Sequence, residues 1–211
     1  RIARATFSNR LRSVRSLHEP KLAVVGNWRE PPNASKPLPR LRYPDAVNLI
    51  FRTILRMIRS RYSSKLHMTD VGRMDFRVVP TDIDVLGHMN NGVYFSIMDL
   101  GRIDLMIRAG AWKALRAKGW YPVMANETMS FRKSLDLWKK YTLETRLVGY
   151  DGKAVYVEQR FVVDGEIYAS AMTRARFLKS TGGTVPVAEL AQLLGADAAT
   201  HEPPAWVSAW A

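Results

Sequence analysis

The chain has 211 residues, 47% of them hydrophobic, which is enough for one packed domain with an extension. The absence of cysteine excludes disulfides, thiolate nucleophiles and cysteine-based metal centres, and it fits a reducing compartment such as the cytoplasm. The net charge of +13 lies mainly in residues 1–70, which contain 15 basic and 4 acidic residues. Residues 71–211 contain 17 basic and 15 acidic residues and are nearly neutral. Because no aromatic–basic motif accompanies these cations, we expect no nucleic-acid partner.

Residues 1–43 are expected to form a basic extension that is largely disordered. The first 20 residues are rich in Arg and Ser, a composition typical both of an organelle transit peptide and of a disordered basic arm. Several prolines follow and exclude a continuous helix: Pro31, Pro32, Pro37, Pro39 and Pro44. No apolar run in the chain approaches the ~18 residues of a membrane-spanning helix.

Residues 44–62 predict a basic amphipathic helix. Apolar residues recur at helical spacing, and arginines occupy the other side: Val47, Ile50, Phe51, Ile54, Leu55 and Ile58 against Arg52, Arg56 and Arg59. Two interpretations stay open. The helix can lie at the periphery of an anionic membrane, or it can dock on the following domain with its arginine face in solvent.

The domain itself is expected over residues 71–195, followed by a tail over residues 196–211. Alternation from Met74 to Val78 predicts a strand, and the segment 92–108 predicts a helix that is buried because it is apolar on nearly every side. Gly101, in the middle of that helix, permits close approach by a strand.

An antiparallel sheet is predicted for the rest of the domain, with strands near 122–134, 140–149, 153–163 and 166–178. Asp151-Gly152 and Asp164-Gly165 indicate hairpins of the type I′ kind. A short helix is expected from Val185 to Leu194. The fold class is therefore α+β, with the sheet wrapped around the buried helix.

Polar side chains cluster between Pro80 and Tyr94, directly before the buried helix. Two carboxylates, an imidazole and two amides at such a position cost stability unless something uses them. The N-terminus of a helix also offers unpaired N–H groups that suit a developing oxyanion. The pattern indicates an acyl-transfer or hydrolysis site. No G-x-S-x-G elbow of a serine hydrolase is present, and the four histidines are too scattered for a metal site.

The same segment resembles the signature of hot-dog-fold acyl-CoA thioesterases, in the residues Asp82, Asp84, Gly87, His88, Met89, Asn90, Asn91, Gly92 and Tyr94. It is similar to the 4-hydroxybenzoyl-CoA thioesterase group and to membrane-associated members of the thioesterase superfamily. The similarity continues through 98–102, 131–134, 158–161 and 206–210, and so covers roughly residues 71–211. It implies a hot-dog fold, a homodimer or tetramer, no metal or organic cofactor, and an acyl-CoA or acyl-carrier-protein thioester as substrate.

The resemblance also implies roles for single residues. It places the catalytic carboxylate at Asp84, as general base or nucleophile, and Tyr94 on the family's aromatic position in the first helical turn. Main-chain N–H groups around Asn91 and Gly92 would bind the oxyanion. His88 is either a catalytic helper or a buried structural histidine.

Four further residues have two interpretations each. Asn90 and Asn91 can position water or the pantetheine arm, or cap the helix. Arg132 and Lys133 follow a strand whose basic end lies near the CoA nucleotide in related enzymes, although a solvated strand end explains them as well. For two neighbours the structural interpretation is favoured: Asp82 as a turn or strand-end residue, and Asp99 as the ion-pair partner of Arg102 rather than a catalytic acid.

The leading hypothesis is an acyl-CoA thioesterase acting on a fatty or aromatic acyl group. An acyl-binding, membrane-associated hot-dog protein with weak catalysis is the non-enzyme alternative. A hot-dog enoyl-CoA hydratase is a third, but Asp84 and His88 are four residues apart and lack the Asn-Pro context typical of those enzymes.

Overall fold

The computed structural model describes residues 45–195 and 203–210, so the predicted extension 1–43 lies outside the described part. The helices are α1 (Asp45–Tyr62), α2 (Asn91–Arg108), α3 (Ala111–Ala117), α4 (Val187–Leu193) and α5 (Ala205–Trp210), with a 3-10 helix, η1 (Pro80–Asp82). The strands are β1 (Gly72–Arg77), β2 (Trp120–Phe131), β3 (Lys140–Tyr150), β4 (Val155–Val163) and β5 (Glu166–Lys179).

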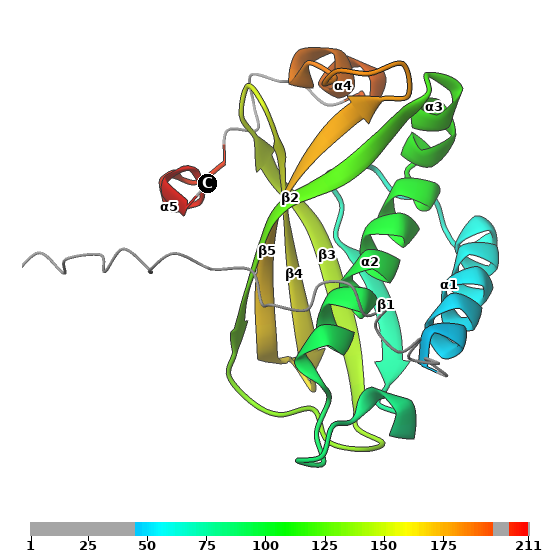
Figure 1. Ribbon diagram of the computed structural model, residues 1–211, viewed down its shortest axis with the longest axis vertical. Helices are drawn as coiled ribbons and strands as arrows, with labels where there is room; N and C mark the ends of the chain where they lie inside the picture. The colour runs from blue at the N-terminus through cyan, green and yellow to red at the C-terminus, as the bar shows by residue number, and fades with distance from the viewer. Residues whose placement is uncertain (1–44, 196–202, 211) are drawn as a thin grey trace, which may run out of the picture. The chain divides into compact units, whose positions relative to one another are not determined.

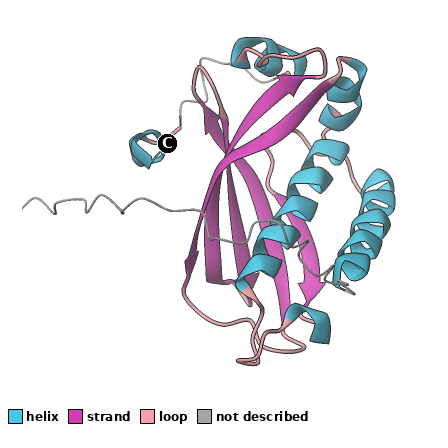
Figure 2. Cartoon of the chain, in the orientation of Figure 1, coloured by secondary structure: helices cyan, strands magenta, loops and turns pink. Residues whose placement is uncertain are grey.

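The five strands form one sheet in the order β1-β3-β4-β5-β2, and every neighbouring pair is antiparallel. The sheet curves around α2, which lies along its concave face (Figure 1). Figure 2 shows that strands and helices form separate layers. The predicted α+β arrangement, an antiparallel sheet around one long buried helix, is confirmed.

The strands match their predicted positions within a few residues, but only one of the two predicted type I′ hairpins forms. Asp164 and Gly165 both have positive φ, 49° and 83°, as that turn requires. At the other hairpin the type I′ prediction is wrong. There the Asp151 carboxylate accepts the N–H groups of Lys153 and Ala154, at 2.6 and 2.7 Å, and so builds a wider turn with its own side chain.

The core lies between α2 and the sheet, and it requires an unusually close approach at Gly101. A Cβ atom at this position would lie 2.5 Å from Thr145 Oγ1, 2.6 Å from Leu143 Cδ2 and 2.9 Å from Gln159 Nε2. Gly101 is therefore the point where the helix backbone touches β3 and β4, as the sequence predicts.

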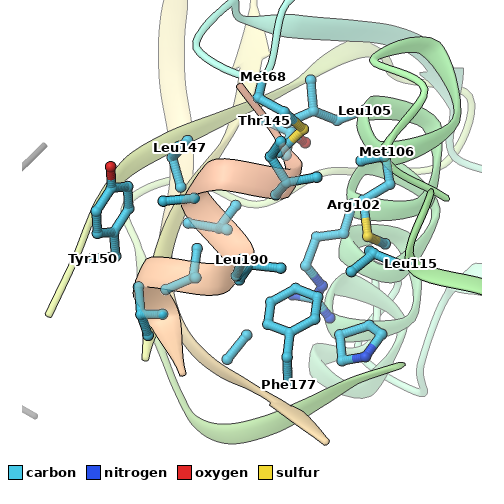
Figure 3. A pocket seen from close by; sticks show the side chains of 18 of the residues that line it. Met68, Arg102, Leu105, Met106, Leu115, Thr145, Leu147, Tyr150, Phe177 and Leu190 are labelled. Atoms are coloured by element: carbon cyan, nitrogen blue, oxygen red, sulfur yellow. The ribbon is translucent and has the colours of Figure 1, made fainter. Parts of the chain in front are cut away.

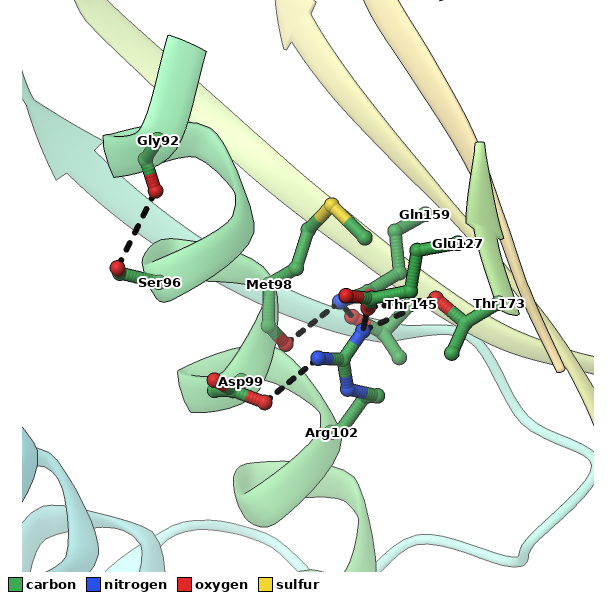
Figure 4. A network of polar contacts seen from close by, with 9 residues as sticks. All are labelled: Gly92, Ser96, Met98, Asp99, Arg102, Glu127, Thr145, Gln159 and Thr173. Atoms are coloured by element: carbon green, nitrogen blue, oxygen red, sulfur yellow. Dashed lines mark hydrogen bonds and ion pairs between the residues drawn. The ribbon is translucent and has the colours of Figure 1, made fainter. Parts of the chain in front are cut away.

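A buried polar network locks the same turn of α2 to the sheet (Figure 4). Arg102 is 7% exposed and donates to four side chains, Asp99, Glu127, Gln159 and Thr173, at 2.6 to 3.0 Å. The side-chain amide of Gln159 in turn donates to the Met98 carbonyl at 2.9 Å. The predicted Asp99–Arg102 pair is confirmed, as one part of this larger network.

Helix α1 packs on α2 on the side away from the sheet (Figure 1), and its orientation differs from the docked arrangement that the sequence suggested. Arg52 points at the domain and pairs with Asp82 at 2.6 Å, while Ser60 donates to Asp104 at 2.5 Å. The large apolar side chains Phe51, Leu55 and Tyr62 are exposed. The expectation of a solvated arginine face is therefore wrong for Arg52. Among the described side chains of this helix, Arg52 and Ser60 bind polar partners on the domain.

The C-terminal tail contains a helix, α5, that periodicity did not reveal. Val207 of this helix is fully buried in a small apolar cluster with Ala154, Tyr156 and Met172. The tail thus contributes to packing through Val207.

Replacement of Gly101 by Ala should destabilise the protein by about 1–3 kcal/mol, because overpacking at three sheet contacts outweighs the ~1 kcal/mol gain in helix propensity. Urea denaturation measures the change. Gly152→Ala is the control, since no heavy atom lies within 4 Å of its added Cβ. A Gly101→Ala protein as stable as the wild type would contradict the close approach.

Replacement of Arg102 by Met should cost about 2–4 kcal/mol, because it leaves two fully buried acceptors, Gln159 and Thr173, without their donor. Arg73→Met removes an exposed ion pair with Glu144 and should cost less than about 1 kcal/mol. The two urea denaturation midpoints would be compared directly. Equal losses would show that the Arg102 network contributes no more than a surface pair.

Candidate functional site

A tight loop before α2 carries the motif residues. Backbone pairing between Ile83 and Met89 closes it, and the Asp84 N–H donates to the His88 carbonyl at 3.0 Å. The Gly87 N–H donates to the Asp84 carbonyl at 3.1 Å, with Gly87 at a φ of 83° that favours glycine. The loop therefore returns the chain so that residues 84 and 88 lie side by side.

The carboxylate of Asp84 faces the imidazole of His88. Oδ2 of Asp84 lies 3.6 Å from Nδ1 of His88, and the two side chains are 23% and 34% exposed. Oδ1 accepts the Leu86 N–H at 2.8 Å, which fixes the carboxyl group in the loop. An oriented carboxylate with one oxygen beside an imidazole, and still open to water, can accept a proton or attack a carbonyl carbon.

Asn90 caps α2, which is one of the two interpretations that the sequence left open. Its side-chain oxygen accepts the Gly92 N–H at 2.8 Å, and its carbonyl accepts the Val93 N–H at 2.9 Å. The Gly92 N–H is thus already occupied. No described residue accepts a hydrogen bond from the Asn91 N–H, which leaves this group at the positive end of α2 for a substrate oxygen.

Tyr94 forms an aromatic wall behind the helix N-terminus. It is 2% exposed, and its ring packs edge-on against Phe131 and Phe161 with centroid distances of 5.1 and 4.8 Å. Burial raises the pKa of its hydroxyl above the ordinary value, so the ring stays neutral. Its ring therefore forms part of the pocket wall.

An open pocket of about 200 Å³ joins the motif to the end of β2. Its lining combines motif residues with the residues that follow β2: His88, Met89, Asn91, Tyr94, Phe131, Arg132, Lys133 and Ser134. Asp84 borders this pocket through its contact with His88 rather than lining it. The structure thus brings together two clusters that are about 40 residues apart in the sequence.

The two basic residues of this pocket differ in their partners. Lys133 pairs with Glu166 at 2.7 Å, and this hydrogen bond raises the pKa of Lys133 above its ordinary value. In the described part of the chain no acid pairs with the Arg132 guanidinium, although the Arg132 backbone is held by the Tyr168 carbonyl at 2.8 Å. Arg132 is therefore the more available cation for a phosphate.

The first acid of the motif, Asp82, has a structural position. It is 2% exposed, pairs with Arg52 of α1 at 2.6 Å and accepts the Val79 N–H at 3.1 Å. Its carbonyl also accepts the Asn90 N–H at 2.8 Å, so it anchors both ends of the loop. Sequence reasoning placed Asp82 in a turn but missed Arg52, because no local pattern links residues 30 positions apart.

A second cavity lies near the other end of α2, among α3, α4 and the strands (Figure 3). It measures about 70 Å³, and its lining is apolar apart from the side chains of Arg102, Thr145 and Tyr150. Figure 3 shows Phe177 and Leu190 among the side chains around it. None of the motif residues 80–94 lines this cavity, and no sequence signal predicted it.

No group of three or more His, Cys, Asp or Glu side chains in residues 45–195 and 203–210 is arranged to hold a metal ion. None of the helices in those ranges is both long and apolar enough to cross a bilayer.

Comparison with solved structures identifies related folds. A probable thioesterase from Escherichia coli, YbaW, superposes with a TM-score of 0.55 at 21% identity, over 58% of this chain and 95% of that one. A gentisyl-coenzyme A thioesterase superposes with a TM-score of 0.52 at 19% identity, over 57% of this chain and 98% of that one. These likenesses establish the hot-dog fold.

Sequence comparison identifies the family. Protein THEM6 of Xenopus laevis is 41% identical over 99 residues, which are 47% of this chain and 48% of that protein. The chain therefore spans about half the length of this relative. The sequence profile of the thioesterase-like superfamily matches residues 78–211, from directly after β1 to the end of the chain. With its motif loop, α2 and four of the five strands inside that match, the chain belongs to the thioesterase-like superfamily.

Proposed function

We propose that this protein is an acyl-CoA thioesterase that hydrolyses a fatty or aromatic acyl thioester to the free acid and CoA. The observation that carries the proposal is the Asp84 carboxylate beside His88, which lines one pocket together with Asn91 at the capped N-terminus of α2. A related solved structure is a gentisyl-coenzyme A thioesterase, which supports a CoA ester over other substrates.

In the proposed reaction Asp84 acts as general base or as nucleophile. As a base, it takes a proton from water while the water oxygen attacks the thioester carbonyl carbon. The resulting oxyanion accepts a hydrogen bond from the Asn91 N–H and is stabilised by the positive end of the α2 dipole. Collapse then breaks the carbon–sulfur bond, and the CoA thiolate leaves and takes up a proton. His88 keeps the Asp84 carboxylate oriented through its Nδ1 atom.

The nucleotide end of CoA is assigned to the basic pair at the end of β2. Arg132 lines the same pocket as His88 and Asn91, and its guanidinium can bind phosphate oxygens with two parallel hydrogen bonds. Lys133 can exchange its exposed partner Glu166 for a phosphate, because a surface ion pair of this kind contributes little stability. The phosphopantetheine of an acyl-carrier protein offers a single phosphate to the same pair.

A homodimer or tetramer is part of the proposal. Strand β2 is an edge of the sheet, and it exposes Tyr121, Val123 and Phe131. An exposed edge with apolar side chains is a surface on which a second copy can pair. Phe131 also lines the pocket at the motif, so a partner at this edge would lie beside the site.

The second candidate is an acyl-binding protein with weak catalysis. The apolar cavity at the far end of α2 favours it, because none of the motif residues 80–94 lines that cavity. A panel of acyl-CoA esters distinguishes the candidates. Release of free CoA supports the thioesterase, binding without turnover supports the acyl-binding protein, and hydration of an enoyl ester without CoA release would identify a hydratase.

Replacement of Asp84 by Asn should lower kcat/KM about 10²–10⁴-fold, because the amide cannot accept the proton or attack the carbonyl. A thiol reagent measures the CoA released, and the protein adds no thiol background because it contains no cysteine. The control is Asp70→Asn, at an exposed acid outside the motif. Unchanged turnover by Asp84→Asn would remove this carboxylate from the mechanism.

Replacement of Arg132 by Ala should raise KM for acyl-CoA about tenfold, with a smaller change in kcat, because it removes a bidentate phosphate contact worth about 1.5–3 kcal/mol. The same acyl group on N-acetylcysteamine, which has no nucleotide, should show no change. Lys153→Ala, at an exposed hairpin, is the matched control. An equal loss with both substrates would place Arg132 in pocket structure rather than in CoA recognition.

A further inference from the structure

Helix α1 presents an apolar surface to solvent. Five large side chains of this helix are 52–88% exposed: Phe51, Ile54, Leu55, Ile58 and Tyr62. They recur at three- and four-residue steps, so they form one continuous ridge along the helix. Contiguous exposed apolar surface of this kind marks a contact site.

The orientation of this ridge is fixed by contacts on the opposite side of the helix. Arg52 pairs with Asp82 at 2.6 Å, and its guanidinium lies 5.9 Å from the ring centroid of Phe76. Ser60, which is buried, donates to Asp104 of α2 at 2.5 Å. Turning the ridge toward the domain would break these contacts, including a buried ion pair. The ridge is thus an outward surface of the folded domain.

The charge around the ridge identifies its partner. The helix carries Arg52, Arg56, Arg59 and Arg61 against a single acid, Asp45, and residues 1–70 contain 15 basic and 4 acidic residues. Arg59 and Arg61 are exposed beside the ridge. A second copy of α1 would bring like charges together at the contact, whereas an anionic bilayer takes up both the apolar side chains and the cations.

We propose that α1 docks in the plane of a membrane surface that contains anionic lipids. The apolar ridge enters the boundary between headgroups and acyl chains, and Arg59 and Arg61 contact the headgroups. Tyr62 suits the same interface, because it has an apolar ring and a polar hydroxyl. Since Arg52 of the same helix holds Asp82, the motif loop stays close to that surface. The proposal stands independently of catalysis.

Site-specific fluorescence on the full chain tests the proposal, because the protein has no cysteine and each variant carries one thiol. Leu55→Cys is labelled with an environment-sensitive nitrobenzoxadiazole dye, and Lys153→Cys, in the hairpin between β3 and β4, is the control. Both are titrated with phosphatidylcholine vesicles with and without phosphatidylglycerol. We expect a blue shift and brighter emission only at position 55 and only with the anionic vesicles.

Vesicle flotation with Ile54→Glu/Ile58→Glu provides the second measurement. We expect binding at least about tenfold weaker than that of the wild type, because two apolar side chains leave the ridge. Trp206→Glu, at an exposed apolar side chain of α5, should keep wild-type binding. Circular dichroism checks that each variant is folded. If the double variant is not folded, the fluorescence of the labelled Leu55→Cys protein alone tests the proposal.

Three outcomes would overturn the proposal. The first is unchanged emission at position 55 with anionic vesicles. The second is emission at position 55 that is already blue-shifted without vesicles, which would mean that another segment or a second copy covers the ridge. The third is full vesicle binding by folded Ile54→Glu/Ile58→Glu, which would assign the binding to other basic residues of the chain.

Discussion

The contact between the middle of α2 and strands β3 and β4 is the constraint on which the rest of the structure depends. Gly101 lets the helix backbone reach the sheet, and the side chains of Arg102 and Gln159 then fix its height and rotation. Once the middle of α2 is fixed, so is its N-terminus about ten residues earlier. The Asn90 cap and the loop before it are positioned by packing that lies far from the site itself.

The loop in turn is held from two sides. Backbone hydrogen bonds to residues 135 and 136 tie it to the segment after β2, and Asp82 ties it to α1. Asp84 is fixed by its own neighbours, His88 and the Leu86 N–H. In the proposed mechanism, a carboxylate that the hydrogen bond from Leu86 and the adjacent imidazole hold in position needs little reorganisation when substrate binds.

The sequence predicts what depends on local periodicity. Alternation located the strands, the all-round apolar segment located α2, and Asp164-Gly165 defined its turn, because each signal lies within a few residues. The hairpin at Asp151 differs because a side chain replaces the expected backbone turn. Periodicity gave the α+β class, whereas the expectation that Arg132 lies near the motif came only from the resemblance.

What the sequence could not predict are contacts between distant segments. A helical pattern divides α1 into two faces but does not show which face contacts the domain. The contacts of α1 with Asp82 and Asp104, which lie far along the chain, determine that orientation. The Arg102 network is another example, because Glu127, Gln159 and Thr173 come from three different strands. The cap also changes which N–H group is proposed to bind the oxyanion, because the Gly92 N–H already donates to Asn90 and the Asn91 N–H does not.

The apolar cavity between α2 and α4 has a consequence for substitutions at this end of the helix. Side chains around a cavity of roughly 70 Å³ make fewer van der Waals contacts with one another than side chains in a filled core. An enlarged apolar side chain is therefore accommodated here with less overpacking than at the turn around Gly101, where sheet atoms leave no room for a single added carbon.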